Sequence, residues 1–172
     1  MSLSLAALVF FALLIQRDLF SLGKLTLRHL VIGVLSFLLL YLIFYAGNIV
    51  TGYILPFKNA QVSMVYSNKA QAAPWMIGVL LLLVIAPGEE FFWRGFIQRQ
   101  FSEKFGAQWG WILGALAYGG VHLITGNAML VIAALVCGFY WGFLFKKEKS
   151  LWPVLISHAL WDFTIFVLFP LK

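Results

Sequence analysis

The chain has 172 residues, of which 63% are apolar and only 10% are charged, and its mean hydropathy is +0.96. A water-soluble globular protein could not cover so apolar a chain with polar surface, so the composition excludes that class and predicts an integral membrane protein. The formal net charge of +6 could indicate nucleic-acid binding. However, the basic residues are scattered among short loops, which predicts membrane lipid as the surroundings and no nucleic-acid partner.

Six apolar segments are predicted to be helices. A helix needs about 20 apolar residues to span a bilayer, and these segments lie near residues 1–16, 30–55, 75–97, 108–125, 128–145 and 151–169. We therefore expect an all-α fold, a polytopic transmembrane helical bundle of about six membrane-spanning helices in a single transmembrane domain over 1–172. The first segment is marginal in length, and a cleaved signal sequence is the alternative to a retained helix. The longest connection, 56–74, is predicted to be a polar loop.

Lysine and arginine are unequally shared between the two sides of this predicted bundle. Most of them lie in the connections 17–28, 99–104 and 146–149, and the opposite side has only Lys58, Lys69 and Lys172. The positive-inside rule then predicts that the basic connections face the cytoplasm and that both termini lie outside. The only cysteine, Cys137, lies within an apolar segment and is predicted to pack as a small hydrophobic side chain.

Acidic residues inside apolar segments are the strongest functional signal in the sequence. An ionisable group at the bilayer centre costs about 2.5–3.5 kcal/mol, so Glu89, Glu90 and Asp162 need partners and a use. Glu90 and Arg94 are four residues apart, which predicts an ion pair; a charge cluster that snorkels into the headgroups is the plainer alternative. Glu89 points about 100° away and suits proton transfer. The preceding Pro87-Gly88 pair is expected to weaken the helix and admit water or peptide.

Two histidines complete the set of buried ionisable groups. His122 follows small residues that would let a neighbouring helix come close, namely Gly114, Ala115, Ala117, Gly119 and Gly120. Alone, His122 would more often be a hydrogen-bonded core histidine than a catalyst. His158 and Asp162 are four residues apart, so the carboxylate can orient the imidazole; a local polar contact between helices is the alternative.

These residues resemble the motifs of the CPBP family, which comprises type II CAAX prenyl endopeptidases, bacteriocin-processing proteins and related Abi proteins. Glu89 to Arg94 resembles the family's Glu-Glu-x-x-x-Arg, Tyr118 to His122 resembles Phe-x-x-x-His, and His158 to Asp162 resembles His-x-x-x-Asn/Asp. The three motifs occur in family order. The resemblance covers a predicted catalytic core of about residues 75–170, and the three motifs together are specific where each alone is weak.

The resemblance implies an intramembrane glutamic-type endopeptidase, of a bacterial plasma membrane, that acts on a membrane-embedded or lipid-anchored peptide. It implies that Glu89 activates water and that His122 assists. His158 and Asp162 would line the oxyanion position, and Glu90 with Arg94 would form a supporting pair. No cofactor is then required. The alternative is a catalytic zinc held by Glu89, His122 and His158, although the chain has no His-Glu-x-x-His element.

The sequence departs from the family pattern at two positions, and it leaves two functions other than proteolysis open. Tyr118 replaces the usual Phe, and its hydroxyl needs a partner. Asp162 stands where the eukaryotic enzymes have Asn, and an ionised Asp cannot donate to an oxyanion; either it is protonated or it orients a donating His158. The rivals are a non-catalytic bacteriocin self-immunity or signalling protein, and an ion or proton carrier. Intact motifs argue against the first rival, and the lack of an inverted repeat argues against the second.

Overall fold

The computed structural model describes residues 2–67 and 73–171, and every regular element in these two ranges is helical. The all-α class is therefore confirmed. Helices occur at all six expected positions, with the bounds α1 (Ser2–Ile15), α2 (Leu27–Ile54), a long helix Pro74–Phe105, α7 (Ala107–Gly120), α8 (Ala128–Glu148) and α9 (Trp152–Phe163). Thr26 caps the start of α2, because its hydroxyl accepts a hydrogen bond from the His29 amide at 3.3 Å.

Within the described ranges, three helices are long and apolar enough to cross a membrane: Leu27–Ile54, Pro74–Phe105 and Ala128–Glu148. Large apolar side chains on their surfaces are exposed, as for Leu35 at 59% and Leu42 at 62% on α2. Such exposure fits helices whose solvent is lipid. The structure thus supports an integral membrane protein with three candidate spans. Two further apolar helices, Ser4–Ile15 and Trp152–Leu168, are shorter, so the count of about six spans stays a prediction.

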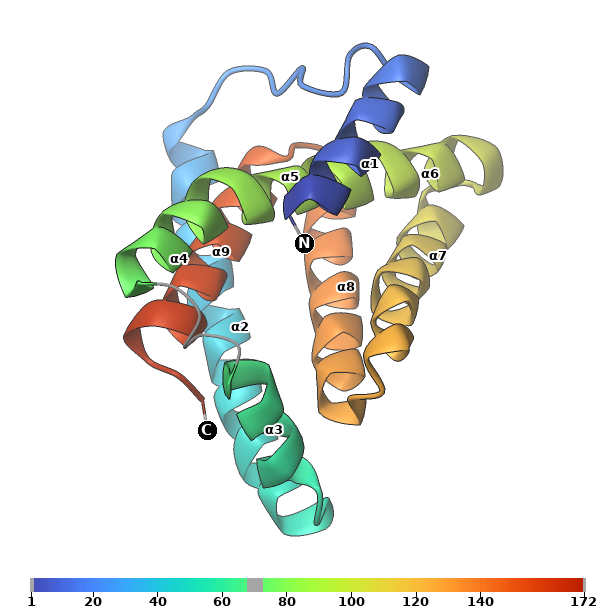
Figure 1. The fold of residues 1–172 in the computed structure, drawn as a ribbon. Helices are drawn as coiled ribbons and strands as arrows, with labels where there is room; N and C mark the ends of the chain where they lie inside the picture. The colour runs from blue at the N-terminus through green and yellow to red at the C-terminus, as the bar shows by residue number, and fades with distance from the viewer. Residues whose placement is uncertain (1, 68–72, 172) are drawn as a thin grey trace.

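The expectation of a loop over 56–74 is wrong, because Lys58–Ser67 forms a helix, α3 (Figure 1). Gln61 ties α3 to the start of α8 through its main chain and its side chain. Its main-chain carbonyl accepts a hydrogen bond from Asn127 Nδ2 at 2.8 Å, and its side-chain Oε1 accepts one from the Met129 amide at 2.9 Å. Asn127 also caps α8, since its Oδ1 accepts from the Leu130 amide at 3.0 Å. Polar composition alone does not reveal such distant partners.

The long helix Pro74–Phe105 is continuous but irregular. Its α-helical parts are α4 (Pro74–Leu80), α5 (Ala86–Glu90) and α6 (Arg99–Phe105), and π-helical stretches Leu81–Ile85 and Phe91–Gln98 join them. Pro87 lacks an amide hydrogen and its ring crowds the preceding turn, a strain that wider π turns accommodate. The helix is thus irregular on both sides of Pro87-Gly88, and the approach of water or peptide at this pair stays a prediction. Gly88 also makes room for α1, because a Cβ there would lie 2.8 Å from Leu5 Cδ2.

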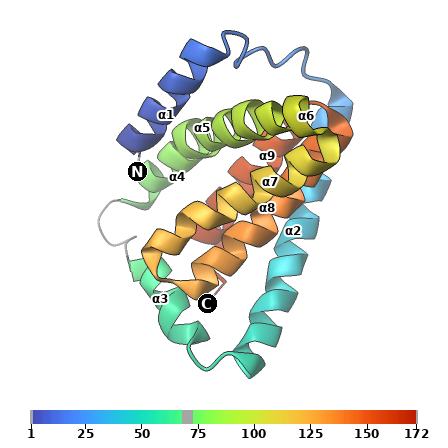
Figure 2. The same ribbon diagram turned by 90° about the vertical axis from the view of Figure 1, so that its right-hand side faces the viewer.

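The elements are arranged around this long helix. It runs across the upper part of the molecule in Figure 1, and α2 and α8 run downward from that level. Figure 2 shows α1 beside the same helix, where Ala12, Leu19 and Phe92 form a small apolar cluster. The main core joins α2, α7, α8 and α9 through Leu40, Tyr118, Ala134, Cys137, Trp141, Val154 and Trp161. Cys137 thus packs in the core as expected.

Close packing of α7 against α8 confirms the expectation drawn from the small residues. A Cβ on Gly138 of α8 would lie 3.0 Å from the carbonyl oxygen of Ala115, and one on Gly119 would meet the Leu135 side chain. Larger residues would hold the two helices apart. The connection between α1 and α2, the α6–α7 turn at Gly106 and the connection between α8 and α9 lie at one end of the molecule (Figures 1 and 2). The three basic connections therefore share one end, as the charge distribution requires.

Candidate active site

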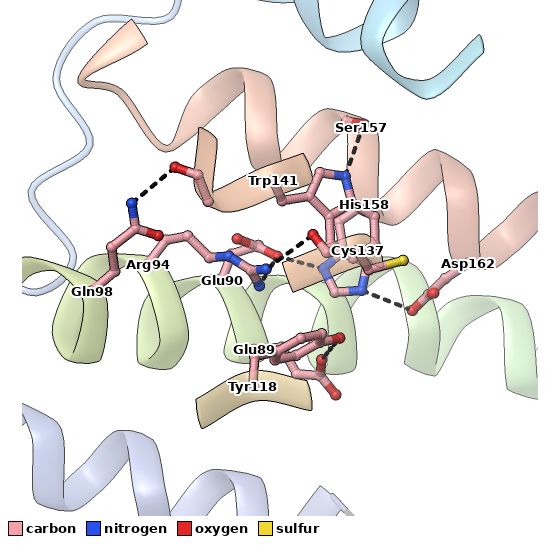
Figure 3. Close-up of polar contacts among 11 residues, drawn as sticks. Glu89, Glu90, Arg94, Gln98, Tyr118, Cys137, Trp141, Ser157, His158 and Asp162 are labelled. Carbon is pink, nitrogen blue, oxygen red and sulfur yellow. Dashed lines mark hydrogen bonds and ion pairs between the residues drawn. The ribbon is translucent and has the colours of Figure 1, made fainter. Parts of the chain in front are cut away.

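Three separate parts of the chain bring the expected site residues other than His122 together (Figure 3). The long helix Pro74–Phe105 carries Glu89, Glu90 and Arg94, and α9 carries His158 and Asp162. Tyr118 comes from α7, and His122 lies in the 3₁₀ turn Val121–Thr125 that follows α7. Figure 3 shows Glu89 and Glu90 pointing in different directions from their helix, so the two acids have different surroundings.

Glu90 is fully buried and has two cationic or potentially cationic neighbours. Its Oε1 accepts a hydrogen bond from Arg94 Nη1 at 2.9 Å and lies 2.6 Å from His158 Nδ1. Glu90 is 0% exposed and Arg94 is 2% exposed. The expected i,i+4 ion pair is therefore present. The alternative of a charge cluster that snorkels into the headgroups is wrong, because neither group reaches the surface of the protein.

Arg94 is held in place by α7 and α8 as well as by Glu90. Its Nη2 donates to the carbonyl oxygen of Cys137 at 3.4 Å. The guanidinium carbon lies 4.6 Å from the ring centroid of Tyr118 and 5.6 Å from that of Trp141. Stacking on aromatic faces offsets part of the cost of burying a charge. The Arg94–Glu90 pair is thus a fixed part of the core.

His158 is enclosed between two carboxylates and an indole. Its Nδ1 faces Glu90, and its Nε2 lies 3.4 Å from Asp162 Oδ2, the expected i,i+4 contact. The Trp141 ring stacks on the imidazole with a centroid distance of 3.8 Å and an angle of 21°. Trp141 is itself fixed, because its Nε1 donates to Ser157 Oγ at 3.1 Å. Trp141 could not be predicted as a site residue from the sequence, since it lies on α8, a different helix from every motif.

Tyr118 contacts both Glu89 and His122, the first with its side chain and the second with its main chain. Its hydroxyl donates to Glu89 Oε2 at 3.0 Å, and its main-chain carbonyl lies 2.9 Å from His122 Nδ1. A carbonyl only accepts, so Nδ1 of His122 carries a proton and Nε2 is left as an acceptor. The tyrosine hydroxyl therefore has the partner that the sequence required. That partner is the acid expected to act as the general base.

The set Glu89, His122 and His158 does not fit a metal ion. Among residues 2–67 and 73–171, no group of three His, Cys, Asp or Glu side chains could hold one. Both ring nitrogens of His158 face carboxylates, which leaves no lone pair directed at a metal.

An apolar cavity of about 230 Å³ lies between α2, α3, α8 and the end of α9. Trp161, which precedes Asp162 in the chain, is part of its wall. The other walls include Phe44 from α2 and Val136 from α8. None of the expected catalytic side chains is part of the cavity wall.

The fold and the site define an all-α membrane protein with a buried cluster of glutamate, histidine and arginine. Residues 71–164 match the sequence profile of the family described as type II CAAX prenyl endopeptidase Rce1-like, and the chain belongs to this family. The matched range includes all three motifs. Neither a curated protein nor a solved structure matches the chain. Membership implies a CAAX-type intramembrane protease or a related member of the family.

Proposed function

We propose that this chain is an intramembrane endopeptidase that hydrolyses a peptide bond in a membrane-embedded or lipid-anchored peptide. One observation carries the proposal: the two adjacent acids have different partners. Glu90 is neutralised by Arg94 and His158, whereas Glu89 has a neutral phenol as its partner and no ion pair within the described ranges. A carboxylate that no cation neutralises remains available to accept a proton from water.

The proposed reaction uses Glu89 as the general base. A water molecule gives its proton to Glu89 while its oxygen bonds to the carbonyl carbon of the substrate, whose oxygen becomes an oxyanion. The tetrahedral intermediate then breaks the C–N bond, and the proton on Glu89 passes to the leaving amine. His122 would hold the water through its free Nε2, because Nδ1 is bonded to the main chain. No further reactant is needed, and both protons of the water are accounted for in the acid and amine products.

His158 would stabilise the oxyanion by donating from Nε2. This nitrogen lies 3.4 Å from Asp162 Oδ2, so it would exchange that long contact for the oxyanion while Nδ1 stays bonded to Glu90. A donor directed at a developing oxyanion contributes about 2.7–4 kcal/mol in hydrolases. Glu90 and Arg94 would keep His158 in position from the other side.

The substrate would approach from the membrane. The apolar cavity supports a substrate with an apolar segment or anchor, because its wall includes Trp161, which is adjacent in the chain to Asp162. The proposal places the protein in a bacterial plasma membrane with the basic connections in the cytoplasm and both termini outside.

The test compares peptides that accumulate in membranes of strains that express different variants. Glu89→Gln should lead to an accumulated precursor, and His122→Ala should accumulate the same one. Glu103→Gln is the matched control, because Glu103 lies on the same helix with a side chain that is 58% exposed. If the Glu89→Gln strain processes the same peptides as wild type at a normal level of inserted protein, the proposal is wrong.

A second candidate is a non-catalytic immunity or signalling protein on the same scaffold. It is favoured by one observation: both nitrogens of His158 are already engaged by carboxylates, as in a purely structural polar core. Complementation of a deletion strain separates the two candidates. Rescue by the Glu89→Ala/His158→Ala double variant would favour binding, and failure of rescue at normal protein levels would favour catalysis.

A further inference from the structure

A second cavity, of about 330 Å³, lies at the end of the molecule where the three basic connections meet. Residues on either side of the α6–α7 turn, the α1–α2 connection and the end of α8 form its walls. Three basic side chains line it, Arg99, Lys146 and Lys149, against a single acidic one, Asp18. Positive charge is therefore in excess within a hollow that the fold itself creates.

The acidic side chain does not neutralise the two lysines. Asp18 pairs with Arg99, whose Nη2 lies 3.0 Å from Asp18 Oδ2, and Arg99 also bonds to Glu103 at 3.2 Å. Lys146 donates to the neutral amide oxygen of Gln108. Lys149 has no ion pair in the part of the chain that the structure describes. Lys146 Nζ also lies 5.0 Å from the ring centroid of Trp111. Neither lysine of the cavity wall is therefore paired with a carboxylate in the described part of the chain, which favours an anionic ligand.

Both lysines lie at the end of α8, where Lys146 is in the last turn of the helix and Lys149 follows its last residue, Glu148. Lys149 ends α8 in the left-handed conformation, with φ of 51°, and its amide donates to the Phe145 carbonyl at 2.8 Å. Lys147, between them, is exposed and is not part of the cavity wall.

We propose that this cavity binds the phosphate of an anionic phospholipid headgroup. The cavity wall also includes the apolar side chains of Leu19, Leu22 and Phe145. A ligand with a charged headgroup joined to apolar chains therefore fits better than a free ion. Basic pockets between membrane helices, near the membrane surface, are suited to such headgroups. The cavity also includes Gln98, one helical turn from Arg94, but none of the expected catalytic side chains. The proposal is therefore independent of the proposed proteolysis.

The test uses the purified full-length chain in a zwitterionic detergent. Short-chain phosphatidylglycerol should raise the unfolding temperature in a saturable way, because a ligand that binds only the folded state stabilises it. Lys149→Gln and Lys146→Gln should each raise the apparent Kd about fivefold, since a lysine near an anionic headgroup contributes about 1 kcal/mol. Lys147→Gln is the matched control and should bind like wild type.

Three results would overturn the proposal. Equal stabilisation by short-chain phosphatidylcholine would show that the headgroup charge is not recognised. Equal stabilisation by inorganic phosphate would mean that the site takes a free anion and not a lipid. An equal loss in Lys147→Gln and Lys149→Gln would indicate only a diffuse surface charge. Folding does not limit the test, because no ion pair holds the Lys149 side chain within the described ranges.

Discussion

Removal of the Arg94 guanidinium should destabilise the protein strongly. Glu90 is 0% exposed, and its Oε2 has no hydrogen-bond donor within the described ranges. The partners that stabilise this carboxylate within the described ranges are therefore Arg94 and His158. Taking away one partner of a buried pair typically costs about 3–5 kcal/mol, because the other charge stays buried without compensation. Arg94→Met should lower the free energy of unfolding by this amount.

The assay is equilibrium unfolding of purified variants in detergent micelles. Arg99→Met is the matched control on the same helix, because the Arg99 side chain is 43% exposed and its ion pairs are on the surface. It should change the free energy of unfolding by less than about 1 kcal/mol. The double variant Glu90→Gln/Arg94→Met removes both charges and should recover about 2–3 kcal/mol of the loss. If Arg94→Met costs no more than Arg99→Met, the reasoning about the buried pair is wrong.

Two further predictions concern Tyr118 and the contact between α7 and α8. Tyr118→Phe removes the 3.0 Å hydrogen bond to Glu89 but keeps the ring. The rate of single-turnover cleavage should fall about tenfold, with little change in the free energy of unfolding. An unchanged rate would refute the role of the hydroxyl. Gly138→Ala should destabilise by about 1–3 kcal/mol in the unfolding assay, because its Cβ would lie 3.0 Å from the Ala115 carbonyl oxygen. Gly52→Ala, whose Cβ meets nothing within 4 Å, is its control and should be neutral or stabilising.

Features that depend on neighbours along the chain could be predicted from the sequence. Helices appear at the six apolar segments because length and hydropathy determine where a lipid-facing helix can form. The contacts Glu90–Arg94 and His158–Asp162 follow from i,i+4 spacing, which brings side chains together on any helix. Small residues before His122 correctly indicated a close helix contact.

Features that depend on how helices meet could not be predicted. Glu90 and His158 are 68 residues apart, and only the packing of α9 against the long helix places them 2.6 Å from each other. The stacking of Trp141 on His158 depends on the same packing. Helix α3 could not be predicted because hydrogen bonds from its polar residue Gln61 to distant partners tie it to α8. The contact of Gly88 with α1 could not be predicted either, since Leu5 is 83 residues away in the chain.

The proposed roles of Glu89 and His122 are tested most directly by kinetic non-additivity. The substrate is the precursor peptide isolated from Glu89→Gln membranes, and the rate is single-turnover cleavage by Glu89→Gln, His122→Ala and the double variant. Residues that act on the same water as a unit are not additive, so the double variant should be no slower than the slower single variant. Losses that multiply, or a His122→Ala rate equal to wild type, would contradict a single site built from both residues.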